Sequence, residues 1–237
     1  MATEVRDDRA AKYYRVRLSG ERLRRCYELA PRRVQQYLDA EVAHVLRRID
    51  AATSVLELGC GYGRVMARLA QPGRWVIGID TSEESLLLVR QTLAGKARCD
   101  VAAMDAADLG FRAATFDAVV CIQNGICAFR VGPATLLQEA LRVVRPEGRV
   151  LFSTYADAFW PHRLEWFSMQ AAEGLVGEID YSRTRRGEIV CKDGFRSAAL
   201  GVNQFTKLCG QLGVQSMLTE VDESSLFCEI TSRRSNR

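Results

Sequence analysis

The sequence is poor in the residue types that most often hold metal ions. Its 237 residues include only two histidines, and no two of its eight cysteines form a C-x-x-C pair. Structural zinc sites draw their ligands from cysteine and histidine at short, regular spacing. The sequence therefore predicts no metal site.

A strong charge of one sign and a long apolar run are also missing. The formal net charge is +4, so composition alone indicates neither a nucleic-acid nor an acidic-membrane partner. No apolar run approaches the roughly 20 residues that cross a bilayer, and the chain opens without a signal-peptide pattern. Cys60, Cys99, Cys121 and Cys228 lie in or beside apolar runs, as is typical of buried reduced thiols. These features predict a cytoplasmic protein.

The composition is that of one ordinary globular domain. Hydrophobic residues make up 48% and charged residues 26% of the chain, which is close to the usual balance. Arginines gather between residues 6 and 48 and again at Arg183, Arg185 and Arg186. We interpret both groups as solvated surfaces in preference to an RNA-binding surface.

Residues 55–64, VLELGCGYGR, form the most informative stretch. An apolar strand that carries Glu57 runs into three glycines on alternate positions, and a helical pattern follows. The glycines are Gly59, Gly61 and Gly63. A glycine turn between strand and helix lets a ligand lie against bare backbone, beside the partly positive helix end. A second apolar run ends in Asp80, where a βαβ unit holds ribose hydroxyls. The sequence therefore predicts a nucleoside site.

Strands and helices alternate after two N-terminal helices. The expected helices span residues 13–30, 31–49, 63–69, 83–93, 133–144 and 203–212, the last capped by Asn203. The expected strands span residues 54–58, 75–79, 98–102, 116–122, 149–154, 214–221 and 225–231. The alternation predicts an α/β fold with a mainly parallel sheet, helices on both faces and an antiparallel C-terminal hairpin.

Residues 155–199 interrupt this alternation. An aromatic-rich helix is expected over residues 155–174, followed by strand-like runs at 176–184 and 188–191 and a turn at Asp193-Gly194. We therefore divide the single domain, residues 1–237, into four parts. They are N-terminal helices (1–50, the first twelve residues charged and loose), a cofactor-binding core (54–154), a substrate-cap insertion (155–199) and a last helix with the hairpin (200–231).

The E-x-G-x-G-x-G pattern of residues 57–63 resembles the first motif of class I S-adenosylmethionine-dependent methyltransferases. Three further segments resemble that family in the same order: MDAADLGF at 104–111, TFDAVVC at 115–121 and LRVVRPEGRVL at 141–151. The resemblance implies a Rossmann-like, doubly wound seven-stranded sheet with an N-terminal helical lid. A nucleotide-dependent oxidoreductase is disfavoured, because Arg64 stands where its motif needs a small residue.

The resemblance implies S-adenosyl-L-methionine as cofactor and S-adenosyl-L-homocysteine as product. Glu57 would face the amino group of the methionine part, while Asp105 and Ala106 would meet the adenine. The implied cofactor-binding residues are Glu57, Gly59, Cys60, Gly61, Gly63, Asp80, Thr81, Asp105, Ala106, Cys121 and Gln123. Asp105 has an alternative role as a capping acid, which Asp108 could share. Asp117 and His44 are expected to be structural.

On the acceptor side, the sequence favours a small molecule. The loop after residue 121 lacks the Asn/Asp-Pro-Pro-Tyr signature of amino-base and glutamine methyltransferases and the Pro-Cys pair of cytosine C5 enzymes. The candidate substrate-binding residues are Tyr14, Tyr27, Asn124, Phe159 and Trp160. Direct in-line transfer needs a dry, well-held acceptor more than a catalytic triad. His162 is the histidine placed to act as a general base.

Other interpretations stay open at this point. An RNA or protein methyltransferase could use the arginine-rich segments, and a non-catalytic scaffold could keep the same fold. The aromatic residues of the insertion could simply pack a lid, and Asn124 could serve only a turn. A thiol or metalloid acceptor is a minor option. The sequence specifies neither the acceptor, nor the methylated atom, nor whether the protein is a monomer or a homodimer.

Overall fold

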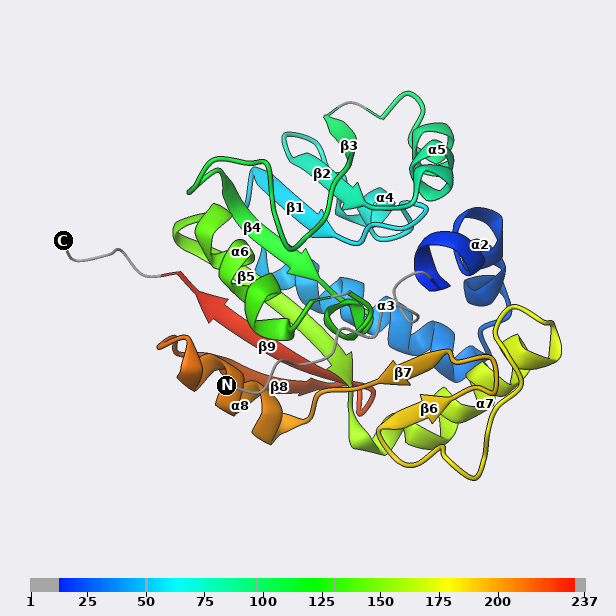
Figure 1. The fold of residues 1–237 in the computed structure, drawn as a ribbon. Helices are drawn as coiled ribbons and strands as arrows, with labels where there is room; N and C mark the ends of the chain where they lie inside the picture. The colour runs from blue at the N-terminus through cyan, green and yellow to red at the C-terminus, as the bar shows by residue number, and fades with distance from the viewer. Residues whose placement is uncertain (1–12, 50, 97, 130, 233–237) are drawn as a thin grey trace.

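The computed structural model describes residues 13–49, 51–96, 98–129 and 131–232; residues 1–12, expected as a loose charged segment, lie outside them (Figure 1). A seven-stranded sheet forms its centre. Its strands are β1 (Ser54–Leu58), β2 (Trp75–Asp80), β3 (Cys99–Ala103), β4 (Phe116–Cys121), β5 (Val144–Tyr155), β8 (Met217–Val221) and β9 (Ser225–Thr231). Their spatial order is β3-β2-β1-β4-β5-β9-β8. The first five strands run parallel, and β9 is antiparallel to both of its neighbours. The predicted fold class is confirmed.

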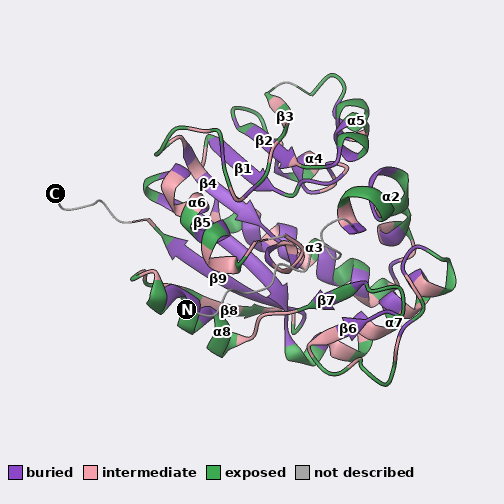
Figure 2. Cartoon of the chain, in the orientation of Figure 1, coloured by how far each residue is buried: buried purple, intermediate pink, exposed green. Residues whose placement is uncertain are grey.

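Helices cover both faces of the sheet (Figure 1). They are η1 (Tyr13–Arg17), α2 (Gly20–Glu28), α3 (Arg32–Arg48), α4 (Met66–Leu69), α5 (Glu83–Thr92), η2 (Gly125–Cys127), α6 (Pro133–Val143), η3 (Asp157–Phe159), α7 (Trp160–Ala172) and α8 (Val202–Gln211). α6 and α8 share one apolar core with the sheet, and α3, α4 and α5 share the other. Figure 2 shows the central strands buried between these layers, as near-continuous apolar runs require.

Two residues predicted to be structural do hold the sheet in place. The carboxylate of Asp117, at the start of β4, accepts hydrogen bonds from Thr53 and Ser54. These donors, together with Arg145, lower the pKa of Asp117 despite its partial burial. His44 of α3 is buried, and its Nε2 lies 2.9 Å from Oε1 of Glu229 on β9. Both lie away from the carboxyl ends of the parallel strands, where ligands bind in such sheets.

Several predicted boundaries were wrong, mostly where glycine turns the chain. The helix expected over residues 13–30 is broken at Ser19, whose φ of −124° and ψ of 168° are extended, and Gly20 after it has a φ of 53°. Gly63, with a φ of 86°, delays α4 to Met66. α8 is capped by Gly201 and not by Asn203; Gln204 Oε1 accepts from the Gly201 N–H at 2.6 Å. β5 also begins earlier than expected, at Val144.

The insertion folds as a cap on one end of the sheet. α7 is followed by a two-stranded sheet of β6 (Glu188–Val190) and β7 (Arg196–Ala198), joined through the predicted turn at Asp193-Gly194. The strand predicted at residues 176–184 was wrong, apart from a single bridge between Ile179 and Cys191. There the Asp180 carboxylate accepts from the N–H and hydroxyl of Ser182, which forms a local turn in place of a ladder.

The cap and the N-terminal helices share a core of their own. Aromatic and aliphatic side chains from η1, α2, α7 and the β6–β7 hairpin pack together there; they include Tyr13, Leu18, Cys26, Phe167, Ile189 and Phe195. The indole Nε1 of Trp166 donates to the Cys26 carbonyl at 2.8 Å. Asp193 accepts from both Tyr13 Oη and Arg17. The predicted N-terminal lid and substrate cap are therefore one packed unit.

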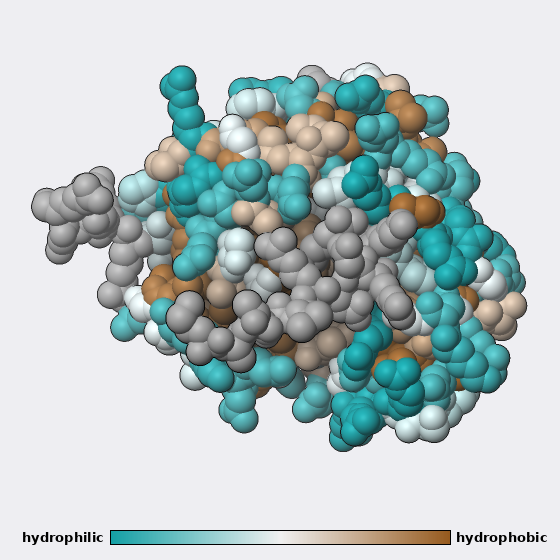
Figure 3. All heavy atoms as spheres, viewed as in Figure 1, coloured by the Kyte–Doolittle hydropathy of each residue, from teal (hydrophilic) through white to brown (hydrophobic). Residues whose placement is uncertain are grey.

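The visible face of the molecule is mainly hydrophilic, with hydrophobic residues in small separate groups (Figure 3). Such scattered residues are normal on a protein surface. Among the described residues, no helix combines the length and hydropathy that a bilayer crossing requires.

Candidate active site

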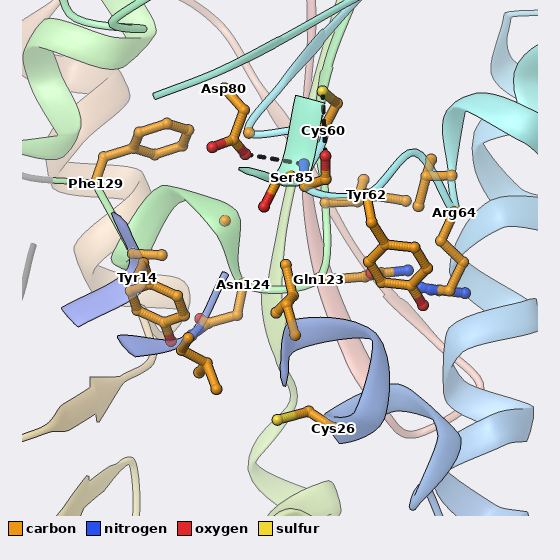
Figure 4. A pocket seen from close by; sticks show the side chains of 18 of the residues that line it. Tyr14, Cys26, Cys60, Tyr62, Arg64, Asp80, Ser85, Gln123, Asn124 and Phe129 are labelled. Carbon is orange, nitrogen blue, oxygen red and sulfur yellow. Dashed lines mark hydrogen bonds between the residues drawn. The ribbon is translucent and has the colours of Figure 1, made fainter. Parts of the chain in front are cut away.

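A cavity of about 390 Å³ lies between the carboxyl ends of the parallel strands and the unit formed by lid and cap. This volume falls within the range of sites for drug-sized ligands. Figure 4 shows Asp80 and Phe129 on one side of it, Tyr62 and Arg64 on another, and Gln123 and Asn124 between them. The cavity therefore sits where open α/β sheets bind their ligands.

Glu57, near the end of β1, gives the cavity a buried carboxylate. The residue is 5% exposed, and its Oε2 has no hydrogen-bond partner among the described residues. Burial raises the pKa of Glu57 to about 8, although the nearby Arg64 opposes the shift. A buried carboxylate oxygen without a donor is costly, so the site fits a ligand that brings a cationic donor.

Asp80 fixes the glycine turn from the neighbouring strand. Its Oδ2 accepts from the Gly61 N–H at 2.9 Å (Figure 4), and its Oδ1 accepts from the Ser82 N–H at 2.8 Å. Gly61 has a φ of 52°, and a Cβ there would lie 3.0 Å from Leu23 of the lid. Each carboxylate oxygen keeps a second lone pair, so Asp80 can also accept from ligand hydroxyls.

The loop after β4 makes the floor of the cavity with two consecutive left-handed residues. Gln123 and Asn124 have φ of 59° and 62°. The Gln123 N–H donates to Oε2 of Glu41 on α3, at 2.8 Å. Asn124 Nδ2 donates to the Ala198 carbonyl at 2.8 Å, and this bond joins the loop to the cap. The side-chain atoms Gln123 Nε2 and Asn124 Oδ1 are buried without partners among the described residues.

Aromatic side chains form the walls on the lid and cap side. Tyr27 of α2 lies between Tyr62 and Trp166, with ring centroids 5.9 and 5.7 Å away. The Arg64 guanidinium stacks over the Tyr27 ring at 4.7 Å. Residues of β5 and the cap complete this wall: Tyr155, Trp166, Phe167, Gln170 and Ser197. Gln170 and Ser197 were not singled out from the sequence, whereas Trp166 and Phe167 were expected among the aromatic residues that wall the acceptor pocket.

Most of the predicted cofactor residues come together around the cavity. Those that line it are Glu57, Gly59, Cys60, Gly61, Asp80, Thr81, Asp105 and Gln123. Gly63, Ala106 and Cys121 do not line it. A Cβ at Gly63 would meet Val89 of α5 at 2.9 Å, so this glycine allows helix packing. Ala106 and Cys121 are buried in the core against α6.

Only some of the residues predicted on the acceptor side line the cavity. Tyr14, Tyr27 and Asn124 line the cavity, whereas Phe159, Trp160 and His162 do not. Phe159 is fully buried against Tyr37, with ring centroids 4.9 Å apart. The side chain of His162 is 42% exposed, and its Nδ1 lies 4.0 Å from Glu165 Oε2. These positions correct two expectations: His162 is not placed as a general base, and Phe159 and Trp160 are packing residues.

Known proteins resemble this chain in the region that carries the sheet end of the cavity. Residues 55–148 match the family model described as a methyltransferase domain. This region therefore resembles a methyltransferase domain. A demethylmenaquinone methyltransferase of Clavibacter sepedonicus is 38% identical over 106 residues, which are 45% of this chain and 42% of that protein. The chain thus matches less than half the length of this relative.

Solved structures extend the similarity of fold over almost the whole chain. The PH0226 protein of Pyrococcus horikoshii superimposes with a TM-score of 0.66 at 20% identity, covering 94% of this chain and 99% of that one. Magnesium protoporphyrin IX methyltransferase of Synechocystis, a structure with bound S-adenosylhomocysteine, gives a TM-score of 0.61 at 19% identity, covering 93% and 97%. At these sequence identities, the structural similarity establishes the fold alone.

Proposed function

We propose that this protein is an S-adenosylmethionine-dependent methyltransferase that acts on a small-molecule acceptor. The observation that carries the proposal is the continuity of one cavity. Its sheet end carries Glu57, Asp80 and Asp105, and its other end is walled by aromatic residues of lid and cap. A cationic nucleoside and an organic acceptor could therefore meet in one enclosed space.

The residues at the sheet end fit the cofactor. Glu57 would hold the ammonium of the methionine part, since its Oε2 has no other donor among the described residues. Asp80 would accept from the ribose hydroxyls, and Asp105 from the adenine amino group. When bound, S-adenosylmethionine supplies a methyl group on a sulfonium, which is already activated for transfer.

The contribution of the chain itself is to position the acceptor and exclude water. None of the described histidines lines the cavity, and the carboxylates that line it come from the ends of β1 and β2 and the loop after β3. Aromatic walls keep the reacting atoms dry and restrict their approach, which is what an in-line displacement needs. The acceptor would be held on the side of Tyr14, Asn124 and Phe167.

A small acceptor is favoured over a macromolecule by the roof of the cavity. Trp166 is hydrogen-bonded to Cys26, and Asn124 to Ala198, so the lid, the cap and the β4 loop are tied together above the site. The relatives described above are methyltransferases of demethylmenaquinone and of magnesium protoporphyrin IX.

All eight cysteines are free thiols, which supports a reducing compartment such as the cytoplasm.

Calorimetry with S-adenosylhomocysteine tests the first half of this proposal, with Glu57→Gln as the matched variant. We expect one site per chain and much weaker binding to the variant. Turnover is then measured as S-adenosylhomocysteine formed from S-adenosylmethionine, with pools of small organic acids, phenols and amines and with total RNA as alternative acceptors. Absence of cofactor binding would refute the function, and turnover with RNA alone would refute the small acceptor.

A further inference from the structure

The two ends of the cavity differ in charge. The three acidic residues that line it, Glu57, Asp80 and Asp105, all belong to β1, β2 and the loop after β3. On the cap side, the lining residues Trp166, Phe167, Gln170 and Ser197 carry no charge. All the acidic lining residues therefore lie at the sheet end, where Arg64 also lines the cavity, and the cap end holds none.

Behind this neutral end lies a buried cation. Arg163 of α7 is only 1% exposed, and among the described residues no carboxylate lies within 4.0 Å of its guanidinium. Its Nη2 donates to the carbonyl and to Oγ of Ser197, at 2.5 and 2.9 Å, and its Nη1 donates to the Gly187 carbonyl at 3.3 Å. Its Nε has no partner among the described residues. Burying a charge without a counter-charge costs several kcal/mol. An anion bound nearby would offset this cost.

Aromatic rings offset part of that cost. The Arg163 guanidinium carbon lies 4.3 Å from the Tyr155 ring centroid, 5.8 Å from that of Trp160 and 5.9 Å from that of Phe167. Cation–π contacts of this kind stabilise a cation without neutralising it. Because Tyr155 and Phe167 also line the cavity, the positive charge lies one side chain behind the cavity wall.

Ser197 connects this charge to the cavity. Its Oγ accepts the Arg163 hydrogen bond, so its own hydroxyl proton remains available to a ligand. Gln170 lies seven residues after Arg163, two helical turns along the same face of α7. It is 3% exposed, lines the cavity and makes no side-chain hydrogen bond to any described residue. Two donors backed by a cation therefore face the space left for the acceptor.

We propose that the cap end of the cavity binds an oxyanion of the acceptor, a carboxylate or a phenolate carried on an aromatic ring. Ser197 and Gln170 donate to the oxyanion, and Arg163 supplies the positive field behind them. The rings of Tyr14, Tyr155 and Phe167 enclose the flat apolar part. This assignment rests on the proposed function, because it names the acceptor class of the same site.

The test uses two pairs of probes that differ in charge but little in shape. Benzoate is compared with benzamide, and 4-nitrophenolate with 4-nitroanisole, by calorimetry on the full chain saturated with S-adenosylhomocysteine. We expect the charged member of one pair to bind about tenfold more tightly or better, as a charge-assisted hydrogen bond implies. Preference for benzoate identifies a carboxylate site, and preference for nitrophenolate identifies a phenolate site.

Ser197→Ala and Gln170→Leu should each reduce the preference for the anion by several-fold. Ser168→Ala is the matched control, since Ser168 lies on α7 outside the cavity and donates to Leu164. Arg163→Lys keeps the charge and should retain part of the preference, whereas Arg163→Met should abolish it. Thermal unfolding shows which variants are folded, and if Arg163→Met is unfolded, the Ser197 and Gln170 variants decide.

Equal binding of charged and neutral probes overturns the proposal, as does an anion preference unchanged in both Ser197→Ala and Gln170→Leu. Absence of binding by either anion up to millimolar concentration also counts against it. The same series is run without S-adenosylhomocysteine. A chain that binds the anion but not S-adenosylhomocysteine contradicts the proposed function alone, and the opposite result contradicts the oxyanion site alone.

Discussion

Glu41 and Gln123 join helix α3 to the floor of the cavity. The backbone N–H of Gln123 donates a hydrogen bond to Oε2 of Glu41, at 2.8 Å. Glu41 is fully buried, and Ser153 Oγ accepts from the same N–H at 2.9 Å. The pair holds the backbone of Gln123 in the left-handed conformation that shapes the loop after β4. A helix outside the methyltransferase match therefore supports the site.

Removing this carboxylate should disturb the loop. Glu41→Leu should lower the free energy of unfolding by about 1–3 kcal/mol, because the buried Gln123 N–H loses one of its two acceptors, and it should weaken S-adenosylhomocysteine binding. Urea unfolding and calorimetry measure the two effects. Glu41→Gln keeps an acceptor oxygen and should be milder, and Asp39→Ala, on the exposed face of the same helix, should change neither.

Cofactor affinity should depend on pH through Glu57. Burial raises the pKa of its carboxyl from 4.5 to about 8, so near neutral pH the empty site holds it protonated. The carboxylate must form before it can pair with an ammonium. The Kd for S-adenosylhomocysteine should therefore fall as pH rises towards about 8, by up to about tenfold per pH unit.

The stability of the empty protein should show the opposite trend. A carboxyl whose pKa is raised by folding contributes most below its unfolded value of 4.5, and that contribution is lost as pH rises through about 8. In Glu57→Gln both dependences should become much shallower. A steep pH dependence of affinity that persists in this variant would assign the titration to another group.

The charge of Asp80 should matter for ligand binding more than for folding. Asp80→Ala should weaken S-adenosylhomocysteine binding by about 1.5–3 kcal/mol, since ribose hydroxyls lose a charged acceptor. It also releases the Gly61 N–H, so Asp80→Asn, which keeps an acceptor oxygen, should bind better than the alanine variant. Asp100→Ala on β3 is the control, because Asp100 accepts from Trp75 and does not line the cavity. Normal affinity in a folded Asp80→Ala protein would remove Asp80 from the site.

A side chain at Gly61 should block the cavity. Gly61→Val combines the cost of a positive φ with a Cβ 3.0 Å from Leu23, so cofactor binding should be lost. Gly73→Val separates the two effects, because Gly73 also has a positive φ, of 84°, but has open space around it. The control should lose stability and keep its affinity, as calorimetry and thermal unfolding can show.

The indole bond between cap and lid should stabilise the roof of the cavity. Trp166→Phe removes the donor to the Cys26 carbonyl and leaves a buried acceptor unpaired, at a cost of about 1–3 kcal/mol. Hydrogen exchange in residues 20–28 should become faster in this variant. Trp75→Phe, which removes the hydrogen bond to exposed Asp100, is the matched control. Unchanged exchange after Trp166→Phe would mean that apolar packing alone holds the lid.

The sheet and the sheet end of the site could be predicted because their signals are local. The central strands β1 and β4 are short, mainly apolar runs, and Glu57, Gly61 and Asp80 belong to a strand–turn–helix pattern that one stretch of sequence contains. The buried face of α3 could also be predicted, since Val34, Leu38, Val42 and Val45 recur at helical spacing and are all buried. These elements are determined by residues that are close together in the sequence.

The acceptor end was predicted only in part: Tyr14, Tyr27 and Asn124 line the cavity, but the contacts of the cap join residues far apart in the chain. Arg163, Trp166, Phe167 and Gln170 follow helical spacing and form the buried face of α7. A sequence pattern would place an arginine on the solvent side, yet Arg163 is buried and the neighbouring His162 is exposed. The partners of Trp166 and Arg163 lie 140 and 34 residues away, beyond the reach of any local rule.

The shared core of lid and cap has a consequence for the synthesis of the chain. Tyr13, Leu18 and Cys26 leave the ribosome early, yet the surfaces that bury them, Phe167 and Phe195, are made about 140 residues later or more. During translation at about 5–20 residues per second, this apolar segment waits several seconds for its partners. We therefore expect a chaperone that binds nascent chains to shield residues 13–28 during this interval.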